Sequence, residues 1–267
     1  MMTREQILTQ LSPAYPWSNL LQYEDLVDST NNHAKTMALS GAPEGTVLIA
    51  DRQTGGRGRR GRSFHSPAGM GVYFSLILRP ACPPDLLMHL TCAVAVAMCD
   101  AVEKTVGFRP GIKWTNDLVS GGKKLAGILT ELGLDSDGTV DYAVIGIGIN
   151  CNQTAEDFPE EIREMAGSLA MIAGHPVDRN VLAATMAEAL YAMNHRLFTG
   201  KEQIMDQYRR DCITVGREIS LHRGTEIRHG TAVDVDDDGA LLVEFTPGHV
   251  EAVNSGEVSI RGLYGYV

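Results

Sequence analysis

Three β-rich segments lie close together between residues 111 and 150, and this succession constrains the fold more than any other feature of the chain. They are GIKW (111–114), KKLAGILTEL (123–132) and TVDYAVIGIGIN (139–150). The glycines at 121–122 and the segment DSDG at 135–138 supply turns between them. Short turns reverse the chain direction, so the sequence predicts an antiparallel meander.

Other segments extend this sheet and cover it. TVLIA (46–50) and GVYFSLILR (71–79) are predicted strands. Predicted helices span residues 3–11, 31–39, 85–106, 158–173, 178–198 and 201–211. Ser29 or Thr30 is placed to cap the second helix. The third helix is long and apolar enough to be buried, and the helices at 158–173 and 178–198 are expected to cover one face of the sheet.

The character of the chain changes near Gly216, where short strands alternate with tight turns. These predicted strands are REISLH, RHGTAVDVD, GALLVEF, HVEAVNS and GEVSIRG. The pattern is typical of a small β-barrel. We therefore expect an α+β fold with two domains: residues 1–213 as a mixed or antiparallel sheet covered by helices, and residues 214–267 as a C-terminal barrel.

Charge and cysteine content narrow the function classes. A formal net charge of −10 argues against a nucleic-acid coat or an anionic membrane as the main partner. The N-terminus lacks the apolar core of a signal peptide, and no stretch reaches the length of a membrane span, so a cytoplasmic protein is expected. The five cysteines form an odd set without a CxxC pair, which favours reduced, buried thiols.

A glycine- and arginine-rich segment stands out against this acidic background. Residues 52–62 contain five arginines and no acid. A solvated basic patch is one interpretation. Anion binding is favoured, because glycines let backbone amides approach a carboxylate or phosphate while guanidinium groups bind it in a bidentate manner. GRGRRG matches a dinucleotide fingerprint, but Pro67 and two glycines follow where a helix must begin.

A second concentration of polar residues lies in KWTNDL (113–118) and in the strand that begins near Lys124. Alternation predicts that Ala126, Ile128 and Thr130 share a sheet face with Lys124. Gly127 beside them would allow a ligand to approach closely.

Two apparent metal motifs are weak. DVDDDG (234–239) resembles the start of a calcium loop, but Phe245 stands where the loop needs a glutamate, so a hairpin turn is predicted. His89 and Cys92 lack a second ligand pair and are expected in the core. No metal site is predicted from protein ligands.

Four segments taken together resemble the biotin protein ligases: DSTNNHA (28–34), DRQTGGRGRRGRSFHSP (51–67), KWTNDL through KKLAGILTEL (113–132) and GIGINCN (146–152). The resemblance spans nearly the whole chain, because that family also ends in a small SH3-like barrel. It implies that biotin and ATP form biotinyl-5′-AMP and pyrophosphate, with Mg²⁺ carried by ATP, and that biotin then passes to a lysine of a biotin carboxyl carrier protein.

The resemblance also implies roles for individual residues. Biotin would contact Ser29, Thr30, Asn31, Gln53, Arg57, Gly58, Arg59, Lys124 and Gly127. The adenylate would contact Arg57, Arg59, Arg60, Phe64, Lys113, Asn116, Lys124 and Asn150. Lys124 and Arg59 would stabilise the charge of the transferring group, while Asp117 would orient or deprotonate the carrier lysine.

Two departures from the family pattern are visible. Thr115 stands where the family usually has proline. Only 28 residues precede Ser29, whereas some members carry an N-terminal winged-helix domain that represses the biotin operon, so we expect a monofunctional ligase without specific DNA binding. A homodimer is compatible with the resemblance. The alternatives are a lipoate or octanoate ligase or transferase, and a regulatory module that binds biotin or nucleotide without catalysis.

Overall fold

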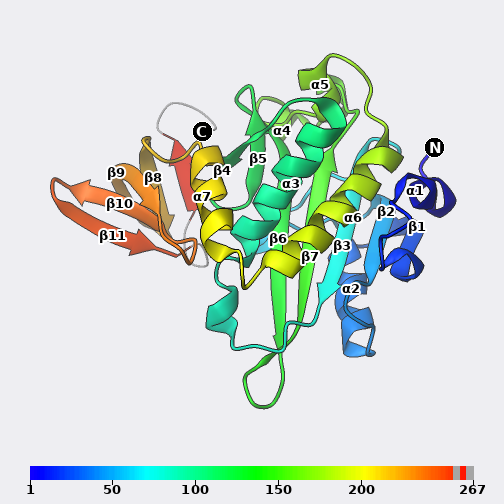
Figure 1. The fold of residues 1–267 in the computed structure, drawn as a ribbon. Coiled ribbons are helices and arrows are strands. Elements are labelled where there is room, and N and C mark those ends of the chain that lie inside the picture. The colour runs from blue at the N-terminus through cyan, green and yellow to red at the C-terminus, as the bar shows by residue number, and fades with distance from the viewer. Residues whose placement is uncertain (255–258, 263–267) are drawn as a thin grey trace.

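The structure, a computed structural model, describes residues 1–254 and 259–262 and contains two β-sheets (Figure 1). The larger sheet has the strand order β1-β2-β3-β7-β6-β5-β4. Its strands are β1 (Leu21–Val27), β2 (Val47–Gln53), β3 (Gly71–Leu78), β4 (Gly111–Lys113), β5 (Asp117–Ser120), β6 (Lys123–Leu134) and β7 (Val140–Asn150). The predicted antiparallel meander is confirmed for β4 through β7.

The sequence did not reveal two strands of this sheet. The edge strand β1 pairs with β2 in parallel, so the sheet is mixed. Only the first and last residues of β1 are buried, which leaves no alternating apolar pattern to detect. The strand β5 has four residues and begins with Asp117, so its composition is not that of an apolar strand.

Helices lie on both faces of the larger sheet. They are α1 (Arg4–Gln10), α2 (Thr30–Leu39), α3 (Leu90–Val106), α4 (Glu160–Arg163), α5 (Leu169–Ala173), α6 (Arg179–Arg196) and α7 (Lys201–Asp211). Short 3-10 turns are η1 (Ser18–Leu20), η2 (Arg59–Gly61), η3 (Pro84–Leu87) and η4 (Ala155–Asp157). The helices α3 and α6 cover one face, and α2 packs on the other. In Figure 1, α3 and α6 lie across the strands, and α7 packs beside α3.

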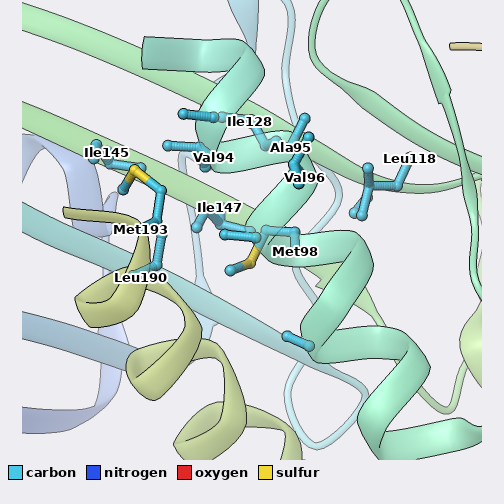
Figure 2. Packing of buried hydrophobic residues seen from close by; sticks show 14 of the residues in the cluster. Val94, Ala95, Val96, Met98, Leu118, Ile128, Ile145, Ile147, Leu190 and Met193 are labelled. Carbon is cyan, nitrogen blue, oxygen red and sulfur yellow. The ribbon is translucent and has the colours of Figure 1, made fainter. Parts of the chain in front are cut away.

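Alternation along β7 separates the core from the opposite face. Ile145, Ile147 and Ile149 are buried in the cluster formed with α3 and α6. Figure 2 shows Ile145 and Ile147 near Val94 and Met98 of α3. Burial of each isoleucine contributes about 1.5–3 kcal/mol. The intervening glycines therefore point away from the helices, toward the face that carries α2.

The predicted buried helix is the central core helix. The segment Pro84–Val106 is apolar enough to cross a membrane by composition, yet 72% of its most apolar window is buried within the protein. Its residues His89 and Cys92 are buried, and His89 Nε2 lies 2.8 Å from the Leu197 carbonyl oxygen. The expectation of core positions is confirmed. All five cysteines are buried free thiols.

The prediction of one continuous helix over residues 158–173 is wrong for the middle of this segment. Two short helices, α4 and α5, flank an extended segment that pairs with the start of β6. The Lys124 amide donates to the Met165 carbonyl at 2.7 Å, and the Gly167 amide donates to the Lys124 carbonyl at 2.9 Å. Periodic apolar residues suggested a helix, but these two bonds hold the backbone as an added β-bridge.

The cap of α2 also differs from the prediction. Ser29 occupies the N-cap position but its side chain makes no capping hydrogen bond. The amide and hydroxyl of Thr30 instead donate to Gln53 Oε1, at 2.8 and 3.2 Å. A residue from β2 thus satisfies the helix N-terminus, which a local cap rule could not anticipate.

The smaller sheet is antiparallel and has the order β11-β10-β9-β8-β12. Its strands are β8 (Glu218–Arg223), β9 (Glu226–Val235), β10 (Leu241–Thr246), β11 (His249–Val253) and β12 (Ser259–Gly262). They match the strands predicted for the C-terminal barrel, although residues 255–258 of SGEVSIRG lie outside the described residues.

The segment DVDDDG forms the turn between β9 and β10, as predicted. Asp236 accepts hydrogen bonds from the amides of Asp238 and Ala240, at 3.0 and 2.8 Å. Gly239 has a φ of +86°, which favours glycine at this point of the turn. Within residues 1–254 and 259–262, no group of three His, Cys, Asp or Glu side chains is arranged to hold a metal ion.

Candidate active site

A cavity of about 930 Å³ opens on the glycine face of the larger sheet. Its lining includes every residue that the sequence analysis placed in the site: Ser29, Thr30, Asn31, Gln53, Arg57, Gly58, Arg59, Arg60, Phe64, Lys113, Asn116, Asp117, Lys124, Gly127 and Asn150. These residues come from five strands (β2, β4, β5, β6 and β7), from α2 and from the loops between them. The fold therefore gathers positions that are widely separated in the chain.

Glycines on β6 and β7 make room for the side chains that cross the cavity floor. A Cβ atom at Gly148 would lie 2.5 Å from the Phe64 ring. A Cβ atom at Gly146 would collide with the amide of Asn31. Phe64, assigned to the adenine by resemblance, lies over these glycines with its ring edge-to-face to Tyr73, 6.5 Å between centroids. The GIGIN pattern therefore serves the core on one face and the cavity on the other.

Lys124 faces the cavity because a β-bulge changes the alternation of β6. Val119 of β5 pairs with Lys124, but Leu118 pairs with Ala126, so Leu125 is an extra residue. Ala126 and Ile128 are buried in the core on the helix side, and Thr130 Oγ1 lies 3.1 Å from the hydroxyl of Thr91 in α3. The prediction that these three residues share a face with Lys124 is therefore wrong.

The ammonium group of Lys124 is paired within the cavity. Its Nζ donates to Asp117 Oδ1 at 2.6 Å, and the two side chains are 30% and 17% exposed. A Cβ atom at Gly127 would lie 3.2 Å from Lys124 Nζ, so the glycine leaves room for the lysine side chain. The lysine to which the resemblance assigns catalysis and the acid assigned to the carrier lysine thus form one ion pair, although they are seven positions apart in the chain.

The glycine–arginine segment forms a hairpin over the cavity, which we call the roof (residues 55–64). The Gly58 amide donates to the Arg62 carbonyl at 2.7 Å, and Arg57 pairs with Ser63 across the hairpin. Arg60 has a φ of +57°, a conformation of the left-handed region. The roof is therefore a defined turn that carries several cations over one end of the cavity.

Two arginines connect the roof to opposite sides of the cavity. Arg59 donates to Asn116 Oδ1 at 2.9 Å. Burial is the main reason that the pKa of the Arg59 guanidinium lies below its ordinary value, although a guanidinium stays charged in proteins. Arg57 donates to Asn32 Oδ1 at 3.0 Å and to Glu131 Oε2 at 3.2 Å. The two arginines therefore diverge from the hairpin.

At the end assigned to biotin, the amide side chains are already engaged. Gln53 accepts from Thr30 and donates to Ser66 Oγ at 2.9 Å. Asn31 Nδ2 donates to the Leu129 carbonyl and to Glu131, at 3.3 and 3.1 Å, and its Oδ1 accepts from Ser75 Oγ at 2.7 Å. Both amide hydrogens of Asn31 are used within the protein, which holds the amide in one orientation.

At the nucleotide end, amides organise the cavity wall. Asn116 Nδ2 donates to the Ile128 carbonyl at 2.8 Å. Asn150 Nδ2 donates to the Gly167 carbonyl at 2.9 Å and its Oδ1 accepts from Gln153 at 3.2 Å. Lys113 is buried in the same wall. These bonds fix the amides in the positions that a bound nucleotide would meet.

The sequence analysis missed several residues around the cavity. Phe158, Ile162 and Met165 form an apolar wall, but they were assigned to a helix on the sheet. Trp114 also lines the cavity, and its indole donates to the Gly239 carbonyl at 2.9 Å. Glu131 is the next-to-last residue of the motif KKLAGILTEL. The sequence offered no reason to select this acid, because its contact with Arg57 forms only in the folded chain.

The chemistry of the site follows from its charges and its shape. Guanidinium and ammonium groups surround a deep cavity whose remaining walls are largely apolar, so two anions that repel each other in water can be held together there. Such a basic cavity on a mixed sheet, next to a small β-domain, defines the class: a ligase that activates a small acid with a nucleotide.

Comparisons with known proteins agree with this class. Residues 23–150 match the biotin/lipoate A/B protein ligase family, and residues 214–261 match the biotin protein ligase C-terminal domain. The bifunctional ligase/repressor BirA of Bacillus subtilis is 37% identical over 247 residues, which cover 90% of this chain and 74% of that protein. The biotin–[acetyl-CoA-carboxylase] ligase of Mycobacterium tuberculosis is 33% identical over 236 residues, 86% and 85% of the two chains.

A solved structure gives the same result. The biotin protein ligase from Aquifex aeolicus, in complex with biotin and ATP, matches with a TM-score of 0.77 and 30% identity, over 91% of this chain and 98% of that chain. The chain belongs to the biotin protein ligase family. The resemblance stated from the sequence is confirmed, as are the two-part fold and the assignment to the ligases.

Proposed function

We propose that the protein is an ATP-dependent biotin protein ligase. It forms biotinyl-5′-AMP and pyrophosphate from biotin and ATP, and then transfers biotin to a lysine of a biotin carboxyl carrier protein. The observation that carries this proposal is the cavity that gathers Lys124 and the roof arginines on the glycine face of the sheet. The alternative, a lipoate or octanoate ligase, shares only the broader family.

In the first step, a biotin carboxylate oxygen attacks the α-phosphorus of ATP. The bond from this phosphorus to the oxygen that bridges to the β-phosphate breaks, and pyrophosphate leaves. Lys124 and Arg59 reduce the repulsion between the two reactants and stabilise the charge on the phosphoryl oxygens. Ser29, Thr30, Asn31 and Gln53 hold the ureido end, while the Gly58 amide and Arg57 lie near the carboxylate.

The nucleotide occupies the other end of the cavity. Lys113, Asn116 and Asn150 line its wall, Arg60 contributes positive charge, and Phe64 packs against the adenine. Gly127 leaves space for the ligand beside Lys124. Mg²⁺ enters with the triphosphate, because it prefers phosphate oxygens and water over a cage of protein ligands.

In the second step, the amine of the carrier lysine attacks the acyl carbon of the adenylate. The carbon–oxygen bond to the phosphate breaks and AMP leaves with the electron pair. Asp117 orients the amine and accepts its proton. The 2.6 Å contact between Asp117 and Lys124 supports this role, because the acid lies beside the ammonium group proposed to bind both reactants.

The remaining assignments concern partners and location. We propose a cytoplasmic enzyme that does not bind DNA specifically, in keeping with its net charge of −10. Two copies can pair through the edge strand β1, which has a hydrogen-bonded neighbour on one side only. The catalytic unit is proposed at residues 1–213 and the C-terminal unit at 214–267. DNA-binding measurements with a biotin-operator sequence check the lack of specific DNA binding, and sedimentation checks the pairing of two copies.

A direct test measures ATP–pyrophosphate exchange with biotin or with lipoate. Exchange with biotin and none with lipoate is the expected result, and the reverse would favour the alternative. Mass spectrometry of a carrier domain, incubated with the enzyme, ATP and biotin, should show the mass of one added biotinyl group. A binding module without catalysis would give neither exchange nor product.

A further inference from the structure

Glu131 of β6 is an acid beside the site, in contact with the cavity-lining residues Asn31 and Arg57, and the reaction above gives it no role. Its side chain is 19% exposed and points to the same side as Asn31. One carboxylate oxygen accepts from Lys35 Nζ at 3.0 Å. The other accepts from Asn31 Nδ2 at 3.1 Å and from Arg57 Nη1 at 3.2 Å. The carboxylate thus joins α2, the sheet and the roof.

The bond to Arg57 reaches the stem of the roof hairpin. Arg57 pairs with Ser63 across the stem, directly before the Gly58 amide that closes the turn. Its guanidinium is anchored twice, by Glu131 and by Asn32. Across the cavity, Arg59 is anchored by Asn116. The roof is therefore tied down at two points, and Glu131 supplies the negative charge that pairs with Arg57.

The environment of Glu131 makes this tie stronger than an ordinary surface ion pair. An exposed pair gains little, because two flexible side chains must be ordered together. Here Asn31 already holds the oxygen of the carboxylate that Arg57 contacts, so pairing with Arg57 costs less conformational entropy. The Glu131 carboxylate also offsets part of the electrostatic repulsion among the roof arginines, because the roof itself contains no acidic residue.

We propose that Glu131 is a positioning residue that holds Arg57 and Asn31 and thereby keeps the roof closed over the acid-binding end of the cavity. This inference rests on the proposed ligase function, since it names a residue that retains the adenylate in the same site. Glu131 contacts no reacting atom in this account. It acts through Arg57 on the release of ligand.

The test compares Glu131→Gln with Arg57→Gln and with the double variant. Glu131→Gln keeps an oxygen that can accept from Asn31 but loses the charge. The expected result is release of biotinyl-AMP about fivefold to tenfold faster and a KM for biotin raised similarly, with kcat changed less than about twofold. The double variant should release no faster than Arg57→Gln alone, because both remove the same tie.

Lys35→Gln is the matched control. It removes the partner of the other carboxylate oxygen, on α2, and touches no roof residue. Release from this variant should stay within about twofold of the wild-type rate. Equal effects of Lys35→Gln and Glu131→Gln, or additive effects of Glu131→Gln and Arg57→Gln, would overturn the proposal and leave Glu131 a structural residue only.

A measurement on the ligand-free protein tests the role of Glu131 separately from the proposed ligase function. Trypsin cleavage at the roof arginines in the empty protein reports opening of the hairpin. Cleavage should be about fivefold faster in Glu131→Gln and near the wild-type rate in Lys35→Gln. If the wild-type protein shows no biotin-dependent ATP–pyrophosphate exchange, the ligase function is refuted, whatever the rates of trypsin cleavage. If Glu131→Gln is active but its rates of trypsin cleavage and biotinyl-AMP release equal those of the wild type, the role of Glu131 is refuted.

Discussion

The cavity floor and the roof are built in opposite ways. The floor, formed by β6 and β7, is a continuous antiparallel ladder from Ala126–Ile149 to Leu132–Ala143, with isoleucines buried beneath it. The roof is a short hairpin of glycines and arginines, held by side-chain bonds from Arg57 and Arg59. The floor contributes Lys124 on a paired strand, and the roof contributes the arginines on a hairpin.

This difference shows how one site can combine precision with exchange. Backbone ladders and buried aliphatic side chains open only with much of the domain, whereas a segment with few buried contacts opens at low cost. The reacting groups need fixed positions, but an adenylate must be retained and then released to the carrier lysine. The two regions divide these tasks.

The largest effect is expected from the floor. Lys124→Ala should reduce adenylate formation by about a thousandfold, because a charge aimed at both reactants is lost. Pyrophosphate release with saturating biotin measures the effect. Lys123→Ala is the matched control, since its ammonium group donates to the carbonyl of Glu164 instead. Near wild-type activity in Lys124→Ala would remove its assigned role.

The next prediction tests whether the cavity floor requires a residue without a side chain at position 146. Gly146→Ala should lower the free energy of unfolding by about 1–3 kcal/mol, because the added methyl group displaces the buried amide of Asn31. Biotin binding should weaken as well. Urea denaturation and calorimetry measure the two quantities. Ile147→Val, on the core face of the same strand, should cost about 0.5–1.5 kcal/mol without weakening biotin binding.

A smaller effect is expected from the roof. Arg59→Gly should leave adenylate synthesis measurable but speed release of biotinyl-AMP about tenfold, since the bond to Asn116 is lost. Stopped-flow chase with excess biotin gives the release rate. Arg52→Ala, at an exposed position of β2 outside the cavity, serves as the control. An unchanged rate in Arg59→Gly would mean that the roof does not retain the adenylate.

The smallest effect concerns pH. Burial acts to raise the pKa of Glu131, but hydrogen bonds from Asn31 and Lys35 and the charge of Arg57 outweigh it, so the pKa lies below its ordinary value of 4.5. A lowered pKa stabilises the fold fully above the unfolded value, and this contribution disappears as pH falls through the folded value.

Wild-type protein should therefore exceed Glu131→Gln in unfolding free energy by under about 1 kcal/mol at neutral pH. The gap should stay constant down to about pH 5 and shrink at lower pH. Urea denaturation across a pH series measures the gap. A gap that grows on acidification would show that the carboxylate is not held in its charged form.

Much of the floor could be predicted from local pattern. Alternation in GIGIN and the glycine turns specify an antiparallel pair with one apolar face, and both features are properties of neighbouring residues. For the roof, the sequence indicated only a composition that binds anions. The partner of each arginine could not be predicted, because the partners, such as Asn116 and Glu131, are distant in the chain.

The face of Lys124 illustrates where local reasoning fails. Strict alternation placed Lys124 with Ala126, but the bulge opposite Leu118 turned it toward the cavity. The same limit applies to residues 158–173, where apolar periodicity suggested one helix and pairing with β6 broke it into two. In both cases a long-range backbone bond overrode the preference of the segment.

By itself the sequence determined the meander strands and their turns, the buried helix and the basic loop, because each depends on side chains close together in the chain. Only the tertiary structure decided the direction of Lys124, the wall formed by Phe158, Ile162 and Met165, and the ties from Arg57 and Arg59. These features depend on register and on contacts between distant segments, which are set when the whole chain packs.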